Sequence, residues 1–317
     1  MGAACQPTRA AWPSAGVRAT TVPVNASPPS ADFERSVERR VAALRQTSLR
    51  AIEAETAARR LEWLEARPGL RSAPASPRRL FEILLLEYMG LRAQDLPVLS
   101  ESAGEITWSS RNPCPTLEAC ARAGLSTAVV CKGAYERSTQ AFLSWFDPRF
   151  RFLRDYGEIR PRAAGCRERI VRLDVEAVMR TALEQARLSR RSGDKGYGAA
   201  VVLGERVLSC RHDTASSERD PSLHAEVNAI REAARALGTA DLSGCVLVST
   251  CEPCPMCSSL AVWANLAAVF HGASIEATAA LGKARIRVPA REIAERSPVR
   301  LEVVGGILEE ECLALYR

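Results

Sequence analysis

Two short motifs constrain this 317-residue chain more than any other feature of its sequence. The first is H-A-E at residues 224–226, and the second is P-C-P-M-C at residues 253–257. Each motif falls where a helix is predicted to begin, and a strand is predicted between them. The chain must fold so that these two helix starts meet, because together they carry three metal-ligand side chains and one carboxylate.

The order of elements after residue 171 predicts a layered α/β domain. The predicted strands cover Ala199–Leu203, Arg206–Cys210, Cys245–Thr250, Ala267–Phe270 and Val299–Val304. A helix over Asp174–Ser189 precedes them, and a short helix is predicted to close the chain. About 28 residues separate the last two strands, enough for a crossover helix around Arg291–Arg296, which favours parallel pairing. We therefore expect a three-layer α/β/α sandwich with a mixed five-stranded sheet over residues 171–317.

The helix that carries the first motif is predicted to begin at Asp220 and Pro221. An aspartate supplies an N-cap oxygen, and a proline fits the first turn, where no amide donor is needed. Gly238 is predicted to end the helix. His224 lies three residues before the apolar Val227, so we expect its side chain on the same buried side.

His224, Cys254 and Cys257 form a zinc-ligand set. The two cysteines lie three residues apart at a helix start, so both sulfurs project to one side, and the positive helix end favours their thiolate form. A catalytic zinc site takes three protein ligands and keeps its fourth position open, whereas a structural site takes four. We therefore predict a catalytic Zn²⁺ ion as the cofactor. Cys251 could compete for the metal, but packing at the strand end is the favoured interpretation.

Glu226 is the predicted catalytic residue. It lies two residues beyond the histidine ligand, where it could take a proton from water, deliver it to a ring nitrogen and then to a leaving amine. The products would be a carbonyl compound and ammonia. The alternative, a solvated helix carboxylate, is disfavoured because the position is predicted to be buried.

Residues 198–317 resemble the cytidine/deoxycytidylate deaminase superfamily, in the branch that holds bacterial guanine deaminases, cytosine deaminases and tRNA adenosine deaminases. D-P-S-L-H-A-E over residues 220–226 and T-C-E-P-C-P-M-C over residues 250–257 carry the resemblance. The second block, with Trp263-Ala264 after it, is especially similar to the guanine deaminase version. The resemblance implies zinc binding by the three ligands, proton transfer by the glutamate, and a homo-oligomer.

His212 and Asp213 mark a departure from the family pattern. The family commonly has an asparagine after its second strand that hydrogen-bonds the substrate, and these two residues take its place. An imidazole or a carboxylate exchanges hydrogen bonds differently from an amide. We therefore treat both as candidate substrate-binding residues, and the motifs specify the reaction more closely than the substrate.

Two segments of simpler composition begin the chain. Residues 1–30 are rich in Ala, Pro and Ser and are predicted to be disordered. Residues 31–79 are predicted to form one long helix over Asp32–Arg67 and a linker, because apolar residues recur at helical spacing and a Pro-Gly pair follows. The exposed face of this helix is dense in Arg and Glu, which is typical of a solvated helix that docks by one stripe.

Residues 80–170 are predicted to form an accessory α+β region. Leu80–Leu91 has a helical pattern, Ser126–Cys131 is predicted to be a short buried strand, and alternation around Phe150 predicts a half-exposed strand. Its four cysteines are Cys114, Cys120, Cys131 and Cys166. They lack paired C-x-x-C spacing, so buried thiols are favoured over a second metal site. The region could select substrate, join subunits or support the fold.

The composition bears on partners and location. The formal net charge is +6, but only three residues are lysines and the arginines are spread along the chain, which is typical of compositional bias and not of a nucleic-acid patch. No apolar run approaches the ~20 residues of a membrane helix. Eleven cysteines without a secretory signal indicate a reducing compartment, so we expect a cytoplasmic protein. The acid-poor N-terminal tail leaves organellar import open.

The sequence therefore predicts a zinc-dependent hydrolytic deaminase of a free nucleobase or nucleoside, with guanine-like and cytosine-like rings as the first candidates. A tRNA adenosine deaminase is the alternative, and a deaminase in pterin or flavin precursor synthesis is a third enzymatic interpretation. A zinc-stabilised scaffold without catalysis is the alternative of another class. The intact Glu226 argues against a scaffold, because a scaffold needs the ligands but no proton carrier.

Overall fold

The computed structural model describes residues 30–72, 74–283 and 286–317. It divides into two compact units between Leu173 and Asp174. We call residues 30–173 the N-terminal unit and residues 174–317 the C-terminal unit. Except for Ser30, the tail predicted to be disordered lies outside the described residues.

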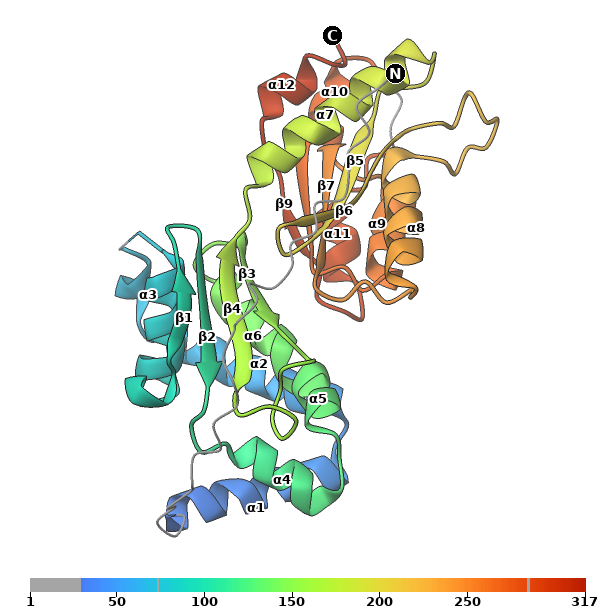
Figure 1. The fold of residues 1–317 in the computed structure, drawn as a ribbon. Helices are drawn as coiled ribbons and strands as arrows, with labels where there is room; N and C mark the ends of the chain where they lie inside the picture. The colour runs from blue at the N-terminus through green and yellow to red at the C-terminus, as the bar shows by residue number, and fades with distance from the viewer. Residues whose placement is uncertain (1–29, 73, 284–285) are drawn as a thin grey trace. The chain divides into compact units, whose positions relative to one another are not determined.

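A five-stranded mixed sheet forms the centre of the C-terminal unit, with strand order β6-β5-β7-β8-β9 (Figure 1). The strands are β5 (Gly198–Leu203), β6 (Arg206–His212), β7 (Cys245–Cys251), β8 (Ala268–Ala273) and β9 (Glu302–Val304). Strand β5 runs antiparallel to β6 and β7, whereas β7, β8 and β9 are parallel. The predicted mixed sheet and the parallel pairing of the last two strands are confirmed, and α11 (Ala290–Glu295) lies at the predicted crossover.

Helices cover both faces of this sheet. Successive strand residues point to opposite faces, and Gly198 and Gly272 lie on the face covered by α7 (Val175–Arg191) and α12 (Glu309–Leu313). A Cβ at Gly198 would lie 1.9 Å from the Ala182 carbonyl oxygen of α7, so only glycine allows this close approach. The opposite face packs into a core with α8 (Ala225–Leu237) and α9 (Pro255–Trp263). The predicted three-layer sandwich is confirmed, with α10 (Ile275–Ala280) following β8.

The predicted start of helix α8 is wrong by about one turn. The helix begins at Ala225 with His224 as its N-cap residue, and not at Asp220. The Asp220 carboxylate instead accepts hydrogen bonds from the backbone amide of Ser222, at 2.8 Å, and from its hydroxyl, at 2.7 Å. This local side-chain turn competes with helix formation at these residues, so the helix begins further along the chain. Gly238 ends the helix with a positive φ of 66°, as predicted.

The N-terminal unit contains a four-stranded antiparallel sheet with order β1-β2-β4-β3. Its strands are β1 (Val98–Glu101), β2 (Glu105–Ser110), β3 (Phe150–Arg154) and β4 (Cys166–Arg172). Its α-helices are α1 (Ala31–Gln46), α2 (Leu49–Glu65), α3 (Pro77–Phe81), α4 (Pro115–Ala123), α5 (Thr127–Val130) and α6 (Arg137–Ser144). Two π-helical segments, η2 (Glu82–Tyr88) and η4 (Cys131–Glu136), continue α3 and α5. Large side chains fill the core, among them Trp108, Phe142 and Phe150.

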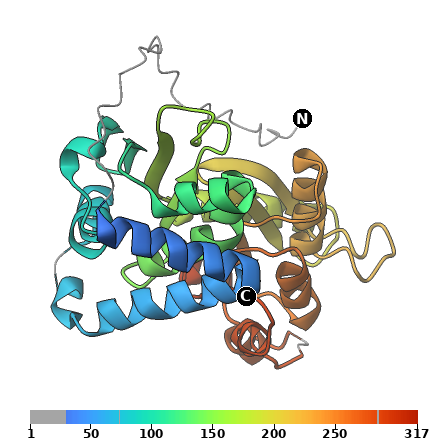
Figure 2. The ribbon, with the colours of Figure 1, turned by 90° about the horizontal axis from the view of Figure 1, so that it is seen from below.

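Three sequence predictions for this unit are wrong in part. The single long helix is two helices, drawn as separate blue rods in Figure 2, because the Ser48 hydroxyl accepts from the Ala51 amide and caps a new start. The segment around Thr127 is helical and not a strand, and its Val129 is 61% exposed. Strand β3 exists, but it is not half-exposed, since Arg151 is only 2% exposed.

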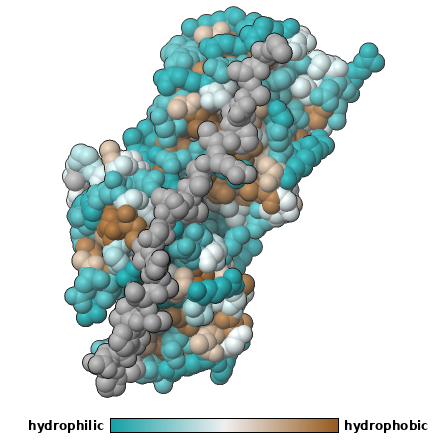
Figure 3. Space-filling view, viewed as in Figure 1, coloured by the Kyte–Doolittle hydropathy of each residue, from teal (hydrophilic) through white to brown (hydrophobic). Residues whose placement is uncertain are grey.

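Within the described residues, none of the helices has both the length and the apolar character that crossing a bilayer requires. Hydrophilic residues, drawn in teal, cover most of the face shown in Figure 3, with smaller apolar patches in brown.

Candidate metal centre and active site

His224 reaches the site from the N-cap position of α8. The loop before it is tied to the helix by Asn228, whose side-chain amide donates to the His212 carbonyl oxygen at 3.0 Å and to the Thr214 hydroxyl at 3.1 Å. The same amide donates to the carbonyl oxygen of Leu223 at 3.3 Å. These bonds fix the chain immediately before the histidine, so its direction is set by the loop and the helix together.

The two cysteines come from the start of α9. Cys254 is its N-cap residue, and Cys257 is buried in its first turn. Just before them, the buried Glu252 carboxylate accepts from the amides of Ile275 and Ala290, each at 2.9 Å. This carboxylate ties the cysteine loop to the first residues of α10 and α11.

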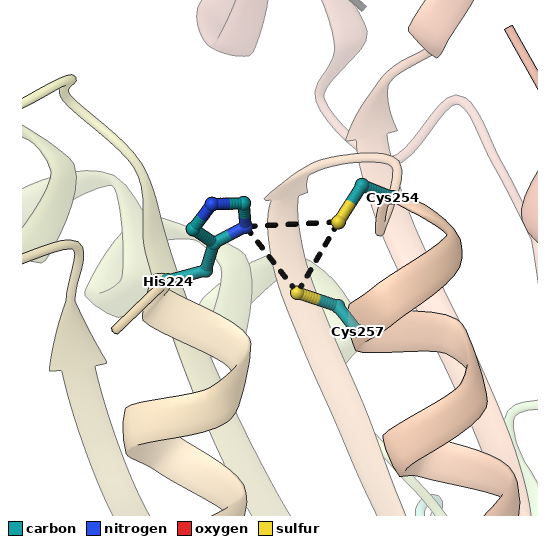
Figure 4. Close-up of side chains that lie close together, drawn as sticks. All are labelled: His224, Cys254 and Cys257. Carbon is teal, nitrogen blue, oxygen red and sulfur yellow. Dashed lines mark hydrogen bonds between the residues drawn. The ribbon is translucent and has the colours of Figure 1, made fainter. Parts of the chain in front are cut away.

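The three predicted ligands converge in the structure. The Nδ1 atom of His224 lies 3.6 Å from the Cys254 sulfur and 3.5 Å from the Cys257 sulfur, and the two sulfurs are 3.6 Å apart (Figure 4). Zinc bonds of ~2.3 Å to sulfur and ~2.0 Å to nitrogen, at tetrahedral angles, place ligand atoms about 3.5 to 3.8 Å apart. The donor set therefore fits zinc in both chemistry and spacing. No other cluster of three such ligands occurs in the part of the chain that the structure describes.

The thiols and the imidazole influence one another's protonation. A hydrogen bond from Cys257 lowers the pKa of the Cys254 thiol to about 4, which favours the thiolate that binds metals. The same contact, together with burial, raises the pKa of Cys257. The hydrogen bond to Cys254 raises the pKa of His224. A negative charge is thus stabilised on the Cys254 sulfur, at one corner of the ligand triangle.

Glu226 lies beside this triangle and is only 5% exposed. Its Oε1 accepts from the Ser249 hydroxyl at 3.3 Å, and its Oε2 lies 3.6 Å from the Cys257 sulfur. Burial raises the pKa of its carboxyl group. A carboxyl with a raised pKa next to a metal site can both accept and donate a proton near neutral pH.

The two candidate substrate-binding residues differ in their surroundings. The His212 ring contacts the Gln185 side chain of α7, with Nδ1 and Oε1 at 3.0 Å. Asp213 is fully buried; its Oδ1 accepts from the Ala215 amide at 3.2 Å, while its Oδ2 has no partner among the described residues. Burial raises the pKa of Asp213, against an opposing electrostatic contribution from His224. Asp213 therefore has a free acceptor atom, and the His212 ring is engaged with α7.

Three residues that support the site were not singled out from the sequence. They are Ser249, Asn228 and Glu252, which position the glutamate, the histidine loop and the cysteine loop. One feature of the sequence could have indicated Ser249, because it is a polar residue within a strand that is buried throughout. The Cys251 sulfur lies 4.0 Å from the Thr278 hydroxyl and outside the ligand triangle.

Comparison with known proteins places this site in a family. The profile of the cytidine and deoxycytidylate deaminase zinc-binding region matches residues 173–273. A tRNA-specific adenosine deaminase of Bacillus subtilis strain 168 is 34% identical over 137 residues, which are 43% of this chain and 83% of that protein. The guanine deaminase of the same organism is 40% identical over 77 residues, 24% of this chain and 49% of that protein. A solved guanine deaminase from Nitrosomonas europaea aligns with 45% of this chain and 82% of its own, with 26% identity and a TM-score of 0.41.

The chain belongs, through its C-terminal unit, to the cytidine and deoxycytidylate deaminase superfamily. The resemblance seen in the sequence motifs is confirmed. The chain spans most of the matched adenosine deaminase but only about half of the matched guanine deaminase.

Proposed function

We propose that this chain is a zinc-dependent hydrolytic deaminase that converts an amino-bearing nucleobase or nucleoside to a carbonyl compound and ammonia. The observation that carries this proposal is the triangle of His224, Cys254 and Cys257, with atoms 3.5 to 3.6 Å apart and the buried Glu226 beside it. Three protein ligands are typical of catalytic zinc. Zinc, when bound, would supply the Lewis acidity that makes water nucleophilic near neutral pH.

Glu226 would carry the protons of the reaction. Its carboxylate takes a proton from the attacking water and passes it to the ring nitrogen beside the reacting carbon, and the water oxygen bonds to that carbon. The second water proton goes to the exocyclic amine, the carbon–nitrogen bond breaks, and ammonia leaves. Water and the amino compound thus become a carbonyl compound and ammonia, and the glutamate returns to its starting state. The raised pKa of Glu226, caused by burial, supports both directions of transfer.

Asp213 is the better candidate for substrate contact. Its buried Oδ2 atom, which has no partner among the described residues, can accept a hydrogen bond from an N–H group of the substrate. A site with such an acceptor discriminates strongly against analogues that lack the donor. Amino-bearing rings with an adjacent N–H, as in guanine, match this requirement.

Deamination of adenosine in tRNA is a second candidate. One observation favours it, the 34% identity that extends over 83% of a tRNA-specific adenosine deaminase. Binding to tRNA through arginines would weaken steeply with salt, because each phosphate contact releases counterions. Loss of turnover between low and high salt on tRNA, but not on a free base, would select this substrate.

Ammonia release from guanine, cytosine, adenine, their nucleosides and tRNA tests the proposal. We expect one of these to turn over with zinc at one equivalent, and Glu226→Gln to lower turnover by about 10² to 10⁴ while zinc stays bound. Glu232→Gln on the same helix is the matched control, because Glu232 pairs with Arg211 on the surface. Full zinc content without turnover on any substrate would reject the enzyme and favour a zinc-stabilised scaffold.

Assembly and location complete the proposal. We infer a homo-oligomer, as the family resemblance implies, and a cytoplasmic location, as the free cysteines indicate. Light scattering of the purified chain and localisation of a tagged chain measure the two directly.

A further inference from the structure

A cavity of about 700 Å³ lies within the N-terminal unit, with residues from α1, α2, η2, α4, β3 and β4 in its wall. Small-molecule sites typically occupy about 300 to 1,000 Å³. The cavity is therefore large enough for a metabolite. All of its lining residues lie between positions 36 and 168, so it is separate from the ligand triangle of the C-terminal unit.

Positive charge dominates the wall of this cavity. Its described lining residues include two glutamates, Glu55 and Glu168, and six arginines: Arg39, Arg40, Arg59, Arg60, Arg154 and Arg160. Glu55 pairs with Arg59 at 2.7 Å, and Glu168 pairs with Arg154. The other four arginines have no carboxylate partner among the described residues, so the wall carries uncompensated positive charge.

Arg60 is the most deeply placed of these four, at 7% exposure. Its Nη1 atom donates to the hydroxyls of Ser138 at 2.8 Å and Thr139 at 2.7 Å. Its Nε atom is buried without a hydrogen-bond partner among the described residues. Burial lowers the pKa of this guanidinium to about 10, still far above neutral, so the charge persists. A buried cation without a counter-ion is strongly unfavourable unless an anion binds beside it.

Two further arginines repeat this pattern. Arg160 donates from Nη1 to the Asn112 carbonyl oxygen at 2.7 Å, while its Nε atom is buried and has no partner in the described chain. Arg154 donates from Nε to Glu168 at 2.8 Å, while its Nη1 atom likewise has none. Glu168 also accepts from Trp108 and Ser110, so its oxygens are already engaged. Three buried guanidinium donors without a partner among the described residues thus lie in one wall, where an oxyanion could accept hydrogen bonds from them.

One part of the wall is apolar. Ile52, Leu84, Leu85 and Phe152 are buried residues that line the same cavity. A ligand that fits both parts has an anionic head and an apolar body, because guanidinium groups bind oxyanions and apolar side chains bind hydrocarbon.

We propose that this cavity binds a small organic oxyanion, a carboxylate or a phosphate ester, with its anionic head against Arg60 and its apolar body against Leu84, Leu85 and Phe152. Arginine forks bind both oxyanions in the same way, so the head group is decided by experiment. The N-terminal unit would thus be a ligand-binding unit, in addition to the proposed catalytic unit.

Calorimetric titration of the zinc-loaded 317-residue chain with hexanoate, hexyl phosphate and hexan-1-ol tests the proposal. The three probes share one hydrocarbon chain and differ in their head group. We expect at least one anion to bind about tenfold or more tightly than the alcohol. The tighter of the two anions identifies the head group. Equal binding of the alcohol and both anions, or no saturable binding of either anion up to about 5 mM, overturns the proposal.

Two neighbouring arginines on α2 provide a matched pair of variants. Arg60→Met should weaken anion binding about tenfold or more, whereas Arg59→Met should change it less than about twofold, because Arg59 is exposed and pairs with Glu55. Glu226→Gln should leave anion binding unchanged, which places the ligand outside the deaminase site. Wild-type binding by Arg60→Met overturns the proposal. If Arg60→Met does not fold, Arg60→Lys and the head-group comparison on the wild-type chain decide.

Discussion

The two units of this protein arrange their polar groups in different ways. In the C-terminal unit, the proposed reactive groups occupy two short stretches, each at the first turn of a helix. In the N-terminal unit, the arginines of the cavity come from two helices, a strand and a loop, and are separated by as many as 121 positions, from Arg39 to Arg160. The first site is compact in sequence and in space, and the second is compact only in space.

This difference follows from the structural requirements of each site. A metal centre needs atoms at fixed separations, and a helix start provides rigid positions with a favourable electrostatic field. An oxyanion cavity needs surplus positive charge and a dry wall, which many combinations of elements can provide. The proposed metal site is therefore recognisable from motifs, whereas the cavity is recognisable only after folding.

Removal of a ligand from the metal centre should have the largest effect. Cys257→Ala should reduce zinc affinity by more than the roughly 100-fold associated with loss of an outer partner, and deaminase activity should disappear with the metal. Zinc content by atomic absorption and ammonia release measure the two. Cys251→Ala is the control, because this thiol lies outside the ligand triangle. Equal zinc loss in both variants would contradict the assigned ligand set.

Removal of the proposed proton carrier should have the second-largest effect. Glu226→Gln should lower kcat by about 10² to 10⁴ with zinc retained, because general acid–base catalysis contributes that much. Steady-state kinetics on the active substrate measure the change. A kcat within a few-fold of wild type would show that another group moves the protons.

A change in the N-terminal core should affect stability without affecting the metal. Phe142 is fully buried among aromatic rings, with its ring centroid 5.5 Å from that of Tyr88. Phe142→Ala should lower the free energy of unfolding by about 3 to 5 kcal/mol, as cavity-forming substitutions do. Urea denaturation followed by circular dichroism measures it. Val129→Ala, at a site 61% exposed, should stay within about 0.5 kcal/mol. Loss of zinc from Phe142→Ala would contradict the separation of the two sites.

The smallest effect is expected at Ser249, which positions Glu226. Ser249→Ala removes one buried hydrogen bond, for which we expect about 0.5 to 1.5 kcal/mol, or roughly a two- to tenfold fall in kcat. The KM value should be unchanged, because the hydroxyl contacts the glutamate. A rise in KM with constant kcat would assign the hydroxyl to substrate binding instead.

The fold of the C-terminal unit was predictable because its signals are local. Gly204 in the turn between β5 and β6, the helix-ending Gly238 and the buried strands each leave a pattern within a few residues. The start of α8 was misplaced because Asp220 resembles an N-cap, although its carboxylate closes a turn with Ser222. Both interpretations use the same residue types, so only the folded geometry separates them.

The N-terminal unit was harder to predict because its tertiary packing overrides local preference. Thr127 and Val130 belong to residue types that favour strands, yet they lie buried three apart on a short helix. Serine is a residue type that caps helix starts, and Ser48 caps the second helix. The helical spacing of the apolar residues nevertheless predicted a single helix. Among the cysteines of this region, Cys114, Cys131 and Cys166 line the cavity, which no spacing rule indicated.

The two hydrogen bonds accepted by Glu252 have a consequence for how the proposed zinc ion would exchange. This one carboxylate holds two helix starts from the residue two positions before Cys254, through bonds that involve no ligand atom. A chelator should therefore remove the ion without unfolding the C-terminal unit. Reloading should be rapid and reversible. Exchange between native and surrogate ions, such as cobalt for spectroscopy, then becomes a practical experiment on the intact molecule.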